Sequence, residues 1–380
     1  MSDESDRGVP APARPAPTAL SGAAASASGA TAPPAASRAS GTTLDELTGE
    51  LAIAPRLAPT TAQTATVYGD LAPRRRRVGI SDLRVFPVAL SGNVFGWTAD
   101  GPIVDGILDV YRAQGGNFLD TADSYAAGRS ETMIGRWMRD RGARDDMVLA
   151  TKVGKSDEHP GLSGRSVTAA VEASLRRLQT DRIDLLYLHI DDPEVEFDET
   201  LLAVDDLIRA GKVRWFGGSD HTGERLFLAR VACAHLGVAP MIAVQNQYSL
   251  LFRREFERDI APVAAQQGLA MMPRFPLAGG ALSGKYRGRR DLPAGSRGRS
   301  LAQFFSRSAA RVVNTLRDIG RERDAAPATV ALAWLLSKPL VTAPVVSASS
   351  PEQVFDLTQA ATLALTRQQV ERLDRASEGF

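Results

Sequence analysis

The chain has 380 residues, of which 44% are hydrophobic, and its 45 Lys and Arg against 44 Asp and Glu leave a formal net charge of +1. This balance gives no global field that would direct the chain to nucleic acid or a membrane surface, and no apolar run approaches the ~20 residues that span a bilayer. The single cysteine, Cys233, excludes an internal disulfide framework and fits a reducing compartment, so we expect a cytoplasmic protein.

Residues 1–73 differ in composition from the rest of the chain. Ala, Pro, Ser, Thr and Gly dominate them, and such a segment buries too little apolar surface to offset its chain entropy. We therefore expect a disordered extension over residues 1–73, with a short amphipathic helix possible only at residues 43–51. The arginine run at residues 74–77 is expected to be a solvated entry to the folded domain.

From residue 78 onward, apolar runs of strand length alternate with amphipathic runs of helix length. The expected strands are residues 88–91, 117–121, 147–153, 184–190, 213–219, 242–247, 269–275 and 342–347. The helical patterns are residues 103–114, 130–141, 163–178, 198–210, 223–236 and 254–267. Continuous apolar strands joined by helical crossovers are typical of parallel sheets.

Eight such strands with their returns close into a (β/α)₈ barrel of about 250 residues, which we expect residues 74–380 to form. Residues 75–86 predict a hairpin that plugs the bottom of the barrel, and residues 287–305 predict a long loop after the seventh strand. Residues 366–377 predict a terminal helix with Thr366 at its N-cap. A doubly wound sheet is the competing architecture, but the Gly-x-Gly-x-x-Gly turn that it needs after the first strand is absent.

Function in such a barrel lies at the carboxyl ends of the strands and in the loops that follow them. Three consecutive expected strands end with polar residues, namely Asp120, Lys152 and His189, and Tyr125 follows in the loop after Asp120. Each residue alone has a plain structural explanation. An Asp, a Lys and a His in apolar strands are nevertheless costly unless they are paired, so their common position predicts one catalytic cluster.

The cluster suits carbonyl reduction, in which hydride addition leaves negative charge on oxygen and a positioned acid supplies a proton. A tyrosine has a pKa of about 10 and is too weak an acid at neutral pH unless its phenolate is stabilised. An ammonium group about 4 Å away is worth roughly 4 kcal/mol at an effective dielectric of 20, enough to lower the pKa by about two or three units. We expect Lys152 to do this for Tyr125, with Asp120 holding Lys152 and His189 directing the substrate oxygen or sharing the proton.

Several motifs in order resemble the aldo-keto reductases from about residue 78 to the end of the chain. They include S-G-N-V-F-G-W, G-G-N-F-L-D-T-A-D-S-Y, A-T-K-V-G, D-R-I-D-L-L-Y-L-H, G-K-V-R-W-F-G-G-S-D, V-Q-N-Q-Y-S-L and P-L-A-G-G-A-L-S-G-K-Y. The resemblance implies a (β/α)₈ barrel with an N-terminal hairpin, an extended NAD(P)H across its top, and a catalytic tetrad of Asp120, Tyr125, Lys152 and His189.

The resemblance also implies a set of cofactor contacts, some of which depart from the family pattern. Ser219-Asp220 stands where the family has Ser-Asn holding the nicotinamide carboxamide, and Gln245 matches the family's other carboxamide partner. Arg274 stands where many members place Tyr or Trp against the nicotinamide, and Leu277 and Gly279 fit the loop that covers the pyrophosphate. The basic residue that binds the 2′-phosphate of NADP is missing before Pro351, so NADPH is the expected cofactor with NADH as the alternative. The implied cofactor-binding residues are Gly92, Ser219, Asp220, Gln245, Arg274, Leu277, Gly279, Ser347 and Gln353, and Trp97 is a candidate substrate-binding wall.

Three functions fit these residues. The first is an NAD(P)H-dependent reductase of aldehydes or ketones acting on a small-molecule carbonyl substrate. The second is a ketoreductase for a keto-sugar nucleotide or a secondary-metabolite intermediate. The third is a cofactor-binding regulatory or scaffold subunit, against which the intact tetrad argues. The four histidines lie on different elements without ligand spacing, so no metal site is expected, and no nucleic-acid motif or oligomeric state is indicated.

Overall fold

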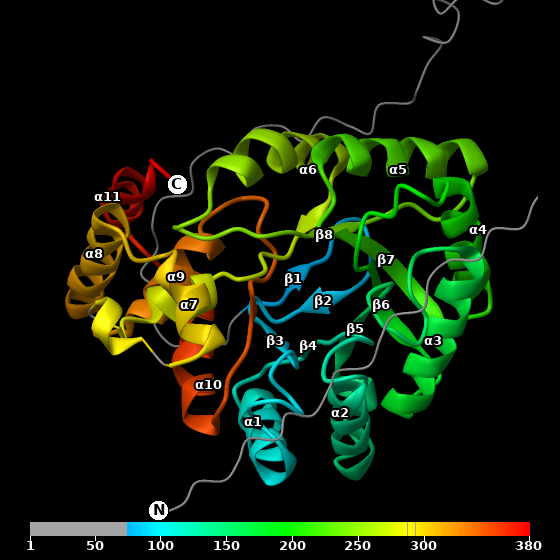
Figure 1. The fold of residues 1–380 in the computed structure, drawn as a ribbon, viewed down its shortest axis with the longest axis horizontal. Coiled ribbons are helices and arrows are strands. Elements are labelled where there is room, and N and C mark those ends of the chain that lie inside the picture. Colours follow the sequence, from blue (N-terminus) through cyan, green and yellow to red (C-terminus); the bar gives the residue numbers. More distant parts are fainter. Residues whose placement is uncertain (1–73, 287, 293) are drawn as a thin grey trace, which may run out of the picture. The chain divides into compact units, whose positions relative to one another are not determined.

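Eight parallel strands form a ring that is surrounded by helices (Figure 1). The computed structural model describes residues 74–286, 288–292 and 294–380. The disordered extension and the helix that we expect within residues 1–73 lie outside the described residues.

The ring runs in the order β10-β3-β4-β5-β6-β7-β8-β9 with every neighbouring pair parallel. It closes where the Val345 N–H donates to the Pro273 carbonyl at 2.8 Å. The (β/α)₈ prediction is therefore confirmed. The strands of the ring are β3 (Ala89–Ser91), β4 (Phe118–Asp120), β5 (Val148–Val153), β6 (Ile183–Leu188), β7 (Val213–Ser219), β8 (Ala243–Gln245), β9 (Ala270–Met271) and β10 (Val345–Val346).

Helices follow the strands and cover the outside of the ring (Figure 1). Most begin at a capping residue or a proline, as α3 does with the Ser163 side chain accepting from the Ser166 N–H. The helices are α1 (Gly101–Ala113), α2 (Arg129–Asp140), α3 (Gly164–Leu178), α4 (Phe197–Arg209), α5 (Gly223–Leu236), α6 (Ala261–Gln267), α7 (Ser296–Ala302), α8 (Arg307–Arg323), α9 (Pro327–Leu336), α10 (Pro351–Thr358) and α11 (Arg367–Ser377).

Side chains of each strand alternate between the inside of the ring and the helix layer. In β6, Leu185 and Tyr187 belong to the inner apolar cluster, whereas Leu186 and Leu188 belong to the larger cluster under the helices. The hairpin β1 (Arg76–Arg77) and β2 (Arg84–Val85) contributes Val85 to the inner cluster and lies across the ring in Figure 1. This placement agrees with the predicted plug and leaves the opposite end of the ring open for a site.

Several expected boundaries differ from those of the structure, and proline explains two of them. β9 and β10 are shorter than expected because Pro273 and Pro344 have no N–H to donate to a neighbouring strand. The stretch expected as one helix at residues 254–267 is a π-helix (Phe256–Ile260) followed by α6. The terminal helix is α11, and Thr366 accepts from the Gln369 N–H at its start, as predicted.

The segment after β9 departs most from its prediction. Residues 287–305 were expected to form a loop, but they contain a short 3₁₀ turn at Arg289–Asp291 and the helix α7. Leu301 of α7 is 2% exposed and packs in the core, and this tertiary contact outweighs the turn-like Gly, Arg and Ser composition. The sequence patterns also missed α8 and α9, which follow α7.

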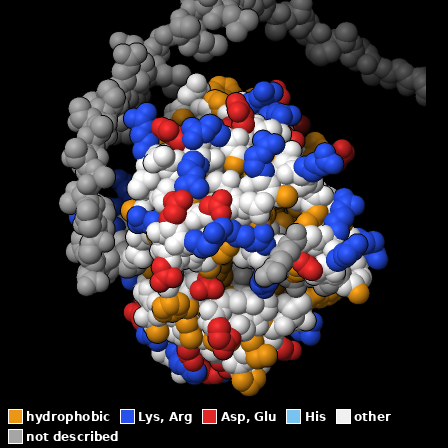
Figure 2. Space-filling model, turned by 90° about the vertical axis from the view of Figure 1, so that its left-hand side faces the viewer, with side chains coloured by type: hydrophobic (Ala, Val, Ile, Leu, Met, Phe, Trp, Pro, Cys, Tyr) orange, Lys and Arg blue, Asp and Glu red, His pale blue; other side chains and the backbone are white. Residues whose placement is uncertain are grey.

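Basic and acidic side chains are interspersed over the face that Figure 2 shows. This distribution agrees with the near-zero net charge of +1 for the whole chain. Among the described residues, no helix combines the length and apolarity that a membrane crossing requires.

Candidate active site

The four predicted catalytic residues meet at one end of the ring. Asp120 is the last residue of β4, Lys152 is the penultimate residue of β5, and His189 directly follows β6. Parallel neighbours in register bring these strand ends together. The side chains are almost fully enclosed: Asp120 is 0%, Lys152 1% and His189 8% exposed.

Asp120 is the centre of the polar network. Its Oδ1 accepts from Lys152 Nζ at 2.5 Å and its Oδ2 accepts from Gln245 Nε2 at 2.8 Å. The Ser91 hydroxyl donates to Oδ1 at the longer distance of 3.4 Å. Lys152 Nζ also donates to the Thr121 carbonyl at 2.9 Å. A buried ammonium with two acceptors and a buried carboxylate with several donors satisfy the requirement that enclosed charges be paired.

Tyr125 lies above this pair and beside His189. Lys152 Nζ is 5.2 Å from the centre of the Tyr125 ring, and the rings of Tyr125 and His189 meet edge to face with centroids 6.0 Å apart. Tyr125 is held in the loop between β4 and α2, where Ala126 and Ala127 both have positive φ angles of 51° and 54°. Such backbone angles are unfavourable for alanine and concentrate at functional sites.

The charges set the proton affinities of Lys152 and Tyr125. Burial by itself lowers the pKa of Lys152, but Asp120 and Tyr125 together outweigh burial and leave that pKa raised, so Lys152 stays cationic. Burial also raises the pKa of Tyr125, and the attraction of Lys152 offsets this only in part because Asp120 opposes it. The expected lowering of the Tyr125 pKa by two or three units is therefore wrong for this structure. The prediction of a lowered Tyr125 pKa treated Lys152 as an isolated cation, whereas the charge of Lys152 is largely balanced by Asp120.

His189 is a neutral ring. Burial, followed by repulsion from Lys152, Lys155 and Arg274, lowers its pKa to about 2. Its Nδ1 is buried and makes no hydrogen bond within the described residues. A neutral imidazole in this position can donate or accept one hydrogen bond toward a ligand without adding charge.

The residues that the resemblance implies for the nicotinamide lie at the ends of β7, β8 and β9 on the same rim. Ser219 Oγ donates to the Gln245 carbonyl at 3.0 Å, so the two predicted carboxamide partners are adjacent. Asp220 has a φ of 59°, and Asp shares with Asn a tolerance of this left-handed region. The exchange of Asn for Asp thus keeps the backbone and changes only the charge.

The two departures from the family pattern are partners of each other. Arg274 Nε donates to Asp220 Oδ1 at 2.6 Å, and Lys155 Nζ donates to Asp220 Oδ2 at 3.2 Å. The Arg274 guanidinium also lies 4.9 Å from the centre of the Phe275 ring. Asp220 therefore compensates the charge that Arg274 introduces. Sequence analysis did not identify Lys155 or Phe275, which are ordinary residue types without a motif of their own.

The loop after β9 has the backbone of a ligand cradle. Phe275, Ala278, Gly279 and Gly280 all have positive φ, with values of 49°, 49°, 67° and 107°. A Cβ on Gly280 would meet no atom within 4 Å, so open space faces its backbone. Leu277 and Gly279, the predicted pyrophosphate-covering residues, lie in this cradle. The N–H groups of Ala278 and Gly280 donate to the carbonyls of Phe275 and Leu277 within the loop. The glycine backbone and the open space beside Gly280 let a pyrophosphate approach closely, so the residues present fit a dinucleotide.

The remaining predicted residues lie on the first and last strands of the ring. Gly92 directly follows β3, where a Cβ would meet Ser130 Oγ at 2.3 Å, so α2 packing by itself requires glycine. Ser347 directly follows β10 and is half-buried. Gln353 Oε1 accepts from the Ser349 N–H at 3.0 Å and braces the turn before α10. Trp97 is 80% exposed in the loop after β3.

A second buried acidic group, Asp123, precedes Tyr125 by two residues. It is not among the predicted site residues, although it belongs to the D-T-A-D motif. Asp123 is 2% exposed, and neither carboxylate oxygen makes a hydrogen bond of good geometry within the described residues. Burial first, and then the nearby Glu131, raise the pKa of Asp123 to about 7, while the Gly154 and Ser124 amides oppose this in part. Glu131 is itself committed to Arg177 at 2.7 Å and to Thr151 at 2.5 Å.

Asp123→Asn is expected to stabilise the protein at alkaline pH and to have little effect in acid. The pKa of Asp123 is about 7 in the fold and about 3.9 in an unfolded chain. The folded protein therefore binds more protons between these values, and its stability falls as pH rises from about 4 to about 7. At about 1.4 kcal/mol per pH unit, removing the carboxyl should recover at most about 3 kcal/mol between pH 5 and pH 8.

Urea denaturation of wild type and Asp123→Asn at pH 5 and pH 8 measures this difference, and the contribution of His189 cancels because both proteins share it. Asp318→Asn, on an exposed face of α8 where Asp318 pairs with Arg321, serves as the control. A stability difference between wild type and Asp123→Asn that does not change with pH would show that Asp123 is ionised throughout.

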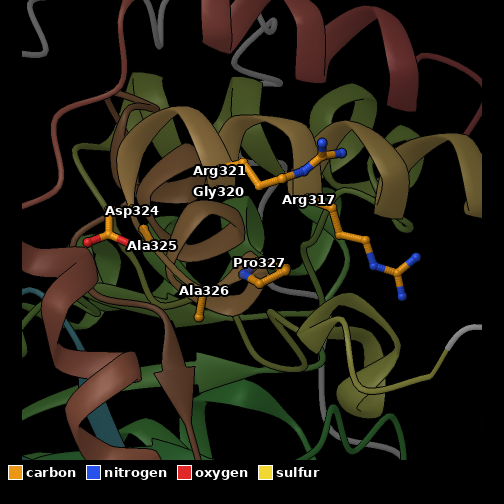
Figure 3. Close-up of a pocket in the computed structure, with 7 residues that line it drawn as sticks. All are labelled: Arg317, Gly320, Arg321, Asp324, Ala325, Ala326 and Pro327. Atoms are coloured by element: carbon orange, nitrogen blue, oxygen red, sulfur yellow. The ribbon is translucent and has the colours of Figure 1, made fainter.

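A surface hollow of about 490 Å³ lies where α8 ends and α9 begins (Figure 3). Its arginines are engaged with neighbours, since Arg317 donates to the carbonyls of Gly284 and Tyr286 and Arg321 pairs with Asp318. None of the predicted site residues lines it, so it contributes nothing to the candidate active site. The lining residues are Arg317, Gly320, Arg321, Asp324, Ala325, Ala326 and Pro327.

Comparison with known proteins agrees with this arrangement. A family model described as Aldo/keto reductase family matches residues 104–378. The chain is 33% identical over 304 residues to an uncharacterized oxidoreductase, YrpG, of Bacillus subtilis (strain 168), which covers 77% of this chain and 92% of that protein. It is 31% identical to a probable voltage-gated potassium channel subunit beta of Oryza sativa subsp. japonica, with 75% and 90% of the two chains covered.

A third relative is an aryl-alcohol dehydrogenase [NADP(+)] of Phanerodontia chrysosporium, 30% identical with 70% of this chain and 74% of that protein covered. The match of the family model over most of the barrel and the shared identity along the relatives show the family. The chain belongs to the Aldo/keto reductase family and is an NAD(P)-dependent oxidoreductase.

Proposed function

We propose that the protein reduces an aldehyde or ketone to an alcohol with NADPH, with Tyr125 as the proton donor. The observation that carries this proposal is the enclosed network in which Asp120 holds Lys152 beneath the Tyr125 ring with His189 at its edge. A cationic group under a phenol and a neutral imidazole beside it are what proton delivery to a forming alkoxide requires.

Each residue of the network has a distinct part in this proposal. When bound, reduced nicotinamide supplies the hydride. Tyr125 Oη gives its proton to the carbonyl oxygen as negative charge develops there, and Lys152 stabilises the phenolate that remains. Asp120 keeps Lys152 charged and oriented, and His189, being neutral, directs the carbonyl oxygen by a hydrogen bond. The raised pKa of Tyr125 keeps the phenol protonated at neutral pH until the reaction provides an acceptor.

For the cofactor, we propose that Ser219 and Gln245 hold the carboxamide, that Asp220 and Arg274 flank the nicotinamide, and that Leu277 and Gly279 cover the pyrophosphate. Gly92, Ser347 and Gln353 complete the proposed cofactor set, and Trp97 is the proposed substrate wall. The name of the Phanerodontia chrysosporium relative supports NADP and an aryl substrate. We also propose that the barrel domain begins at residue 74.

Transfer of a labelled hydride tests the reaction. The protein is incubated with an aromatic aldehyde and NADPH deuterated at the transferring carbon, and the alcohol is examined by mass spectrometry. We expect one deuterium on the carbinol carbon. Titration by tryptophan fluorescence in parallel is expected to give a lower Kd for NADPH than for NADH. Tight cofactor binding with no label transferred to any member of a panel of aldehydes and ketones would refute the reductase and favour the regulatory-subunit alternative.

A further inference from the structure

The mouth of the candidate site carries basic residues that the proposed reaction does not use. Lys155 follows β5 and shares the carboxylate of Asp220 with Arg274, so these three residues leave one positive charge uncompensated. Arg129, the first residue of α2, donates to the carbonyls of Ala126 and Gly96. Among the residues that the structure describes, it forms no ion pair with a carboxylate, which adds a second positive charge beside the Tyr125 loop.

Several other charges near the mouth have partners within the protein. Lys152 and Asp120 cancel, and Arg225 pairs with Asp191 at 2.8 Å. Of the acidic groups on the two neighbouring loops, Glu158 pairs with Arg177, and Asp192 accepts from the Leu162 N–H. Lys155 and Arg129 are thus basic groups at the mouth that a negatively charged ligand can contact.

Two basic side chains at the mouth act on the reacting groups themselves. Lys155 and Arg274 both contribute to the lowered pKa of His189, and Arg274 also lowers the pKa of Tyr125 against the larger effect of burial. Lys155 is the more available of the two cations. Its side chain is 38% exposed and its contact with Asp220, at 3.2 Å, is longer than the 2.6 Å contact of Arg274. Exposed pairs of this kind contribute about 0–1 kcal/mol, so Lys155 can exchange Asp220 for a ligand.

Resting on the proposed reductase function, we infer that the site prefers carbonyl substrates that carry a carboxylate, with Lys155 binding that carboxylate and Arg129 attracting it from the Tyr125 side. The exposed rings of Trp97 and Phe275, 80% and 49% exposed on loops after β3 and β9, are available to the apolar part of such a substrate.

A matched pair of substrates tests the inference. 4-Formylbenzoate and 4-formylbenzamide have the same size, planarity and reacting group and differ in one negative charge. We expect wild type to favour the carboxylate about tenfold in kcat/KM, and Lys155→Gln to reduce that ratio about three- to tenfold, the effect of one screened charge at close range. Arg129→Gln should reduce the ratio less, and Asp220→Asn, which removes the competing carboxylate, should raise it.

Lys212→Gln is the control, because it removes one positive charge just before β7, at the opposite end of the ring. It should leave the ratio as in wild type. The preference of wild type should also weaken as salt rises from 0.05 to about 0.5 M, since screening shortens the range of charge interactions.

Binding provides a readout that does not depend on turnover. Calorimetric titration of the NADPH complex with benzoate and benzamide should show tighter binding of benzoate in wild type and a smaller difference in Lys155→Gln. Equal kcat/KM for the two aldehydes, or equal binding of benzoate and benzamide, would overturn the inference while leaving a reductase of neutral substrates intact. A Kd for NADPH that rises in Lys155→Gln with an unchanged substrate ratio would assign Lys155 to the cofactor and overturn it equally.

Discussion

Tyr125→Phe is expected to lower kcat for carbonyl reduction by about 10²–10⁴-fold, the usual contribution of a positioned general acid. Phenylalanine keeps the ring that meets His189 edge to face and removes only the hydroxyl that would donate the proton. Cofactor binding should persist because Tyr125 is not among the proposed cofactor contacts. Single-turnover reduction with saturating NADPH measures the chemical step directly.

Tyr286→Phe is the matched control, since the Tyr286 ring packs edge-on against Phe305 away from the tetrad. It should retain wild-type kcat. If Tyr125→Phe kept more than about a tenth of the wild-type rate, a smaller loss than a general acid accounts for, another group would have to supply the proton. His189 would then be the next candidate, although its pKa of about 2 means that hardly any of it carries the second proton at neutral pH.

Lys152→Met is expected to reduce both stability and activity. Methionine leaves the Asp120 carboxylate buried without its ammonium partner, and breaking a buried ion pair from one side costs about 3–5 kcal/mol. The phenolate of Tyr125 would also lose the cation placed beneath it, so kcat should fall even at temperatures where the variant is folded. Urea denaturation and single-turnover kinetics measure the two effects separately.

The double variant Asp120→Asn with Lys152→Met separates folding from chemistry. Removing both charges should restore part of the free energy of unfolding, because no uncompensated buried charge remains. Its kcat should stay as low as that of Lys152→Met. Recovery of activity together with stability would mean that Lys152 acts only on the fold, and the proposed role in catalysis would have to be abandoned.

The sequence was informative at positions where burying a polar or charged side chain costs free energy. Asp120, Lys152 and His189 interrupt apolar strands at corresponding positions, and parallel register converts corresponding positions into neighbours in space. Eight apolar runs of strand length, with helical patterns between them, predicted the ring itself. The position of residues 75–86 before the first strand predicted the hairpin. These predictions depend on local pattern and on rules of sheet topology, which a sequence displays directly.

Other features depend on contacts between distant segments. α7 forms because Leu301 is buried in the core, and composition alone indicated a loop. The direction in which the pKa of Tyr125 shifts depends on the balance of burial, Lys152 and Asp120. Considering the charge of Lys152 alone predicted a lowered pKa, whereas the pKa is raised. Asp220 and Arg274 form an ion pair although they are 54 positions apart in the chain. The sequence therefore displays two separate departures from the family pattern and does not show that they are partners.

Asp120 hydrogen-bonds to residues that are 29, 32 and 125 positions away along the chain. No contiguous fragment shorter than residues 91–245, from β3 to β8, therefore contains the whole network, and a chain divided between β6 and β7 would separate Gln245 from the carboxylate that it contacts. Backbone amides around Asp120 should accordingly be among the slowest to exchange with deuterium, because exposing them requires the ring to open as a unit. The tetrad and the closed ring are thus expected to appear in the same cooperative step of folding.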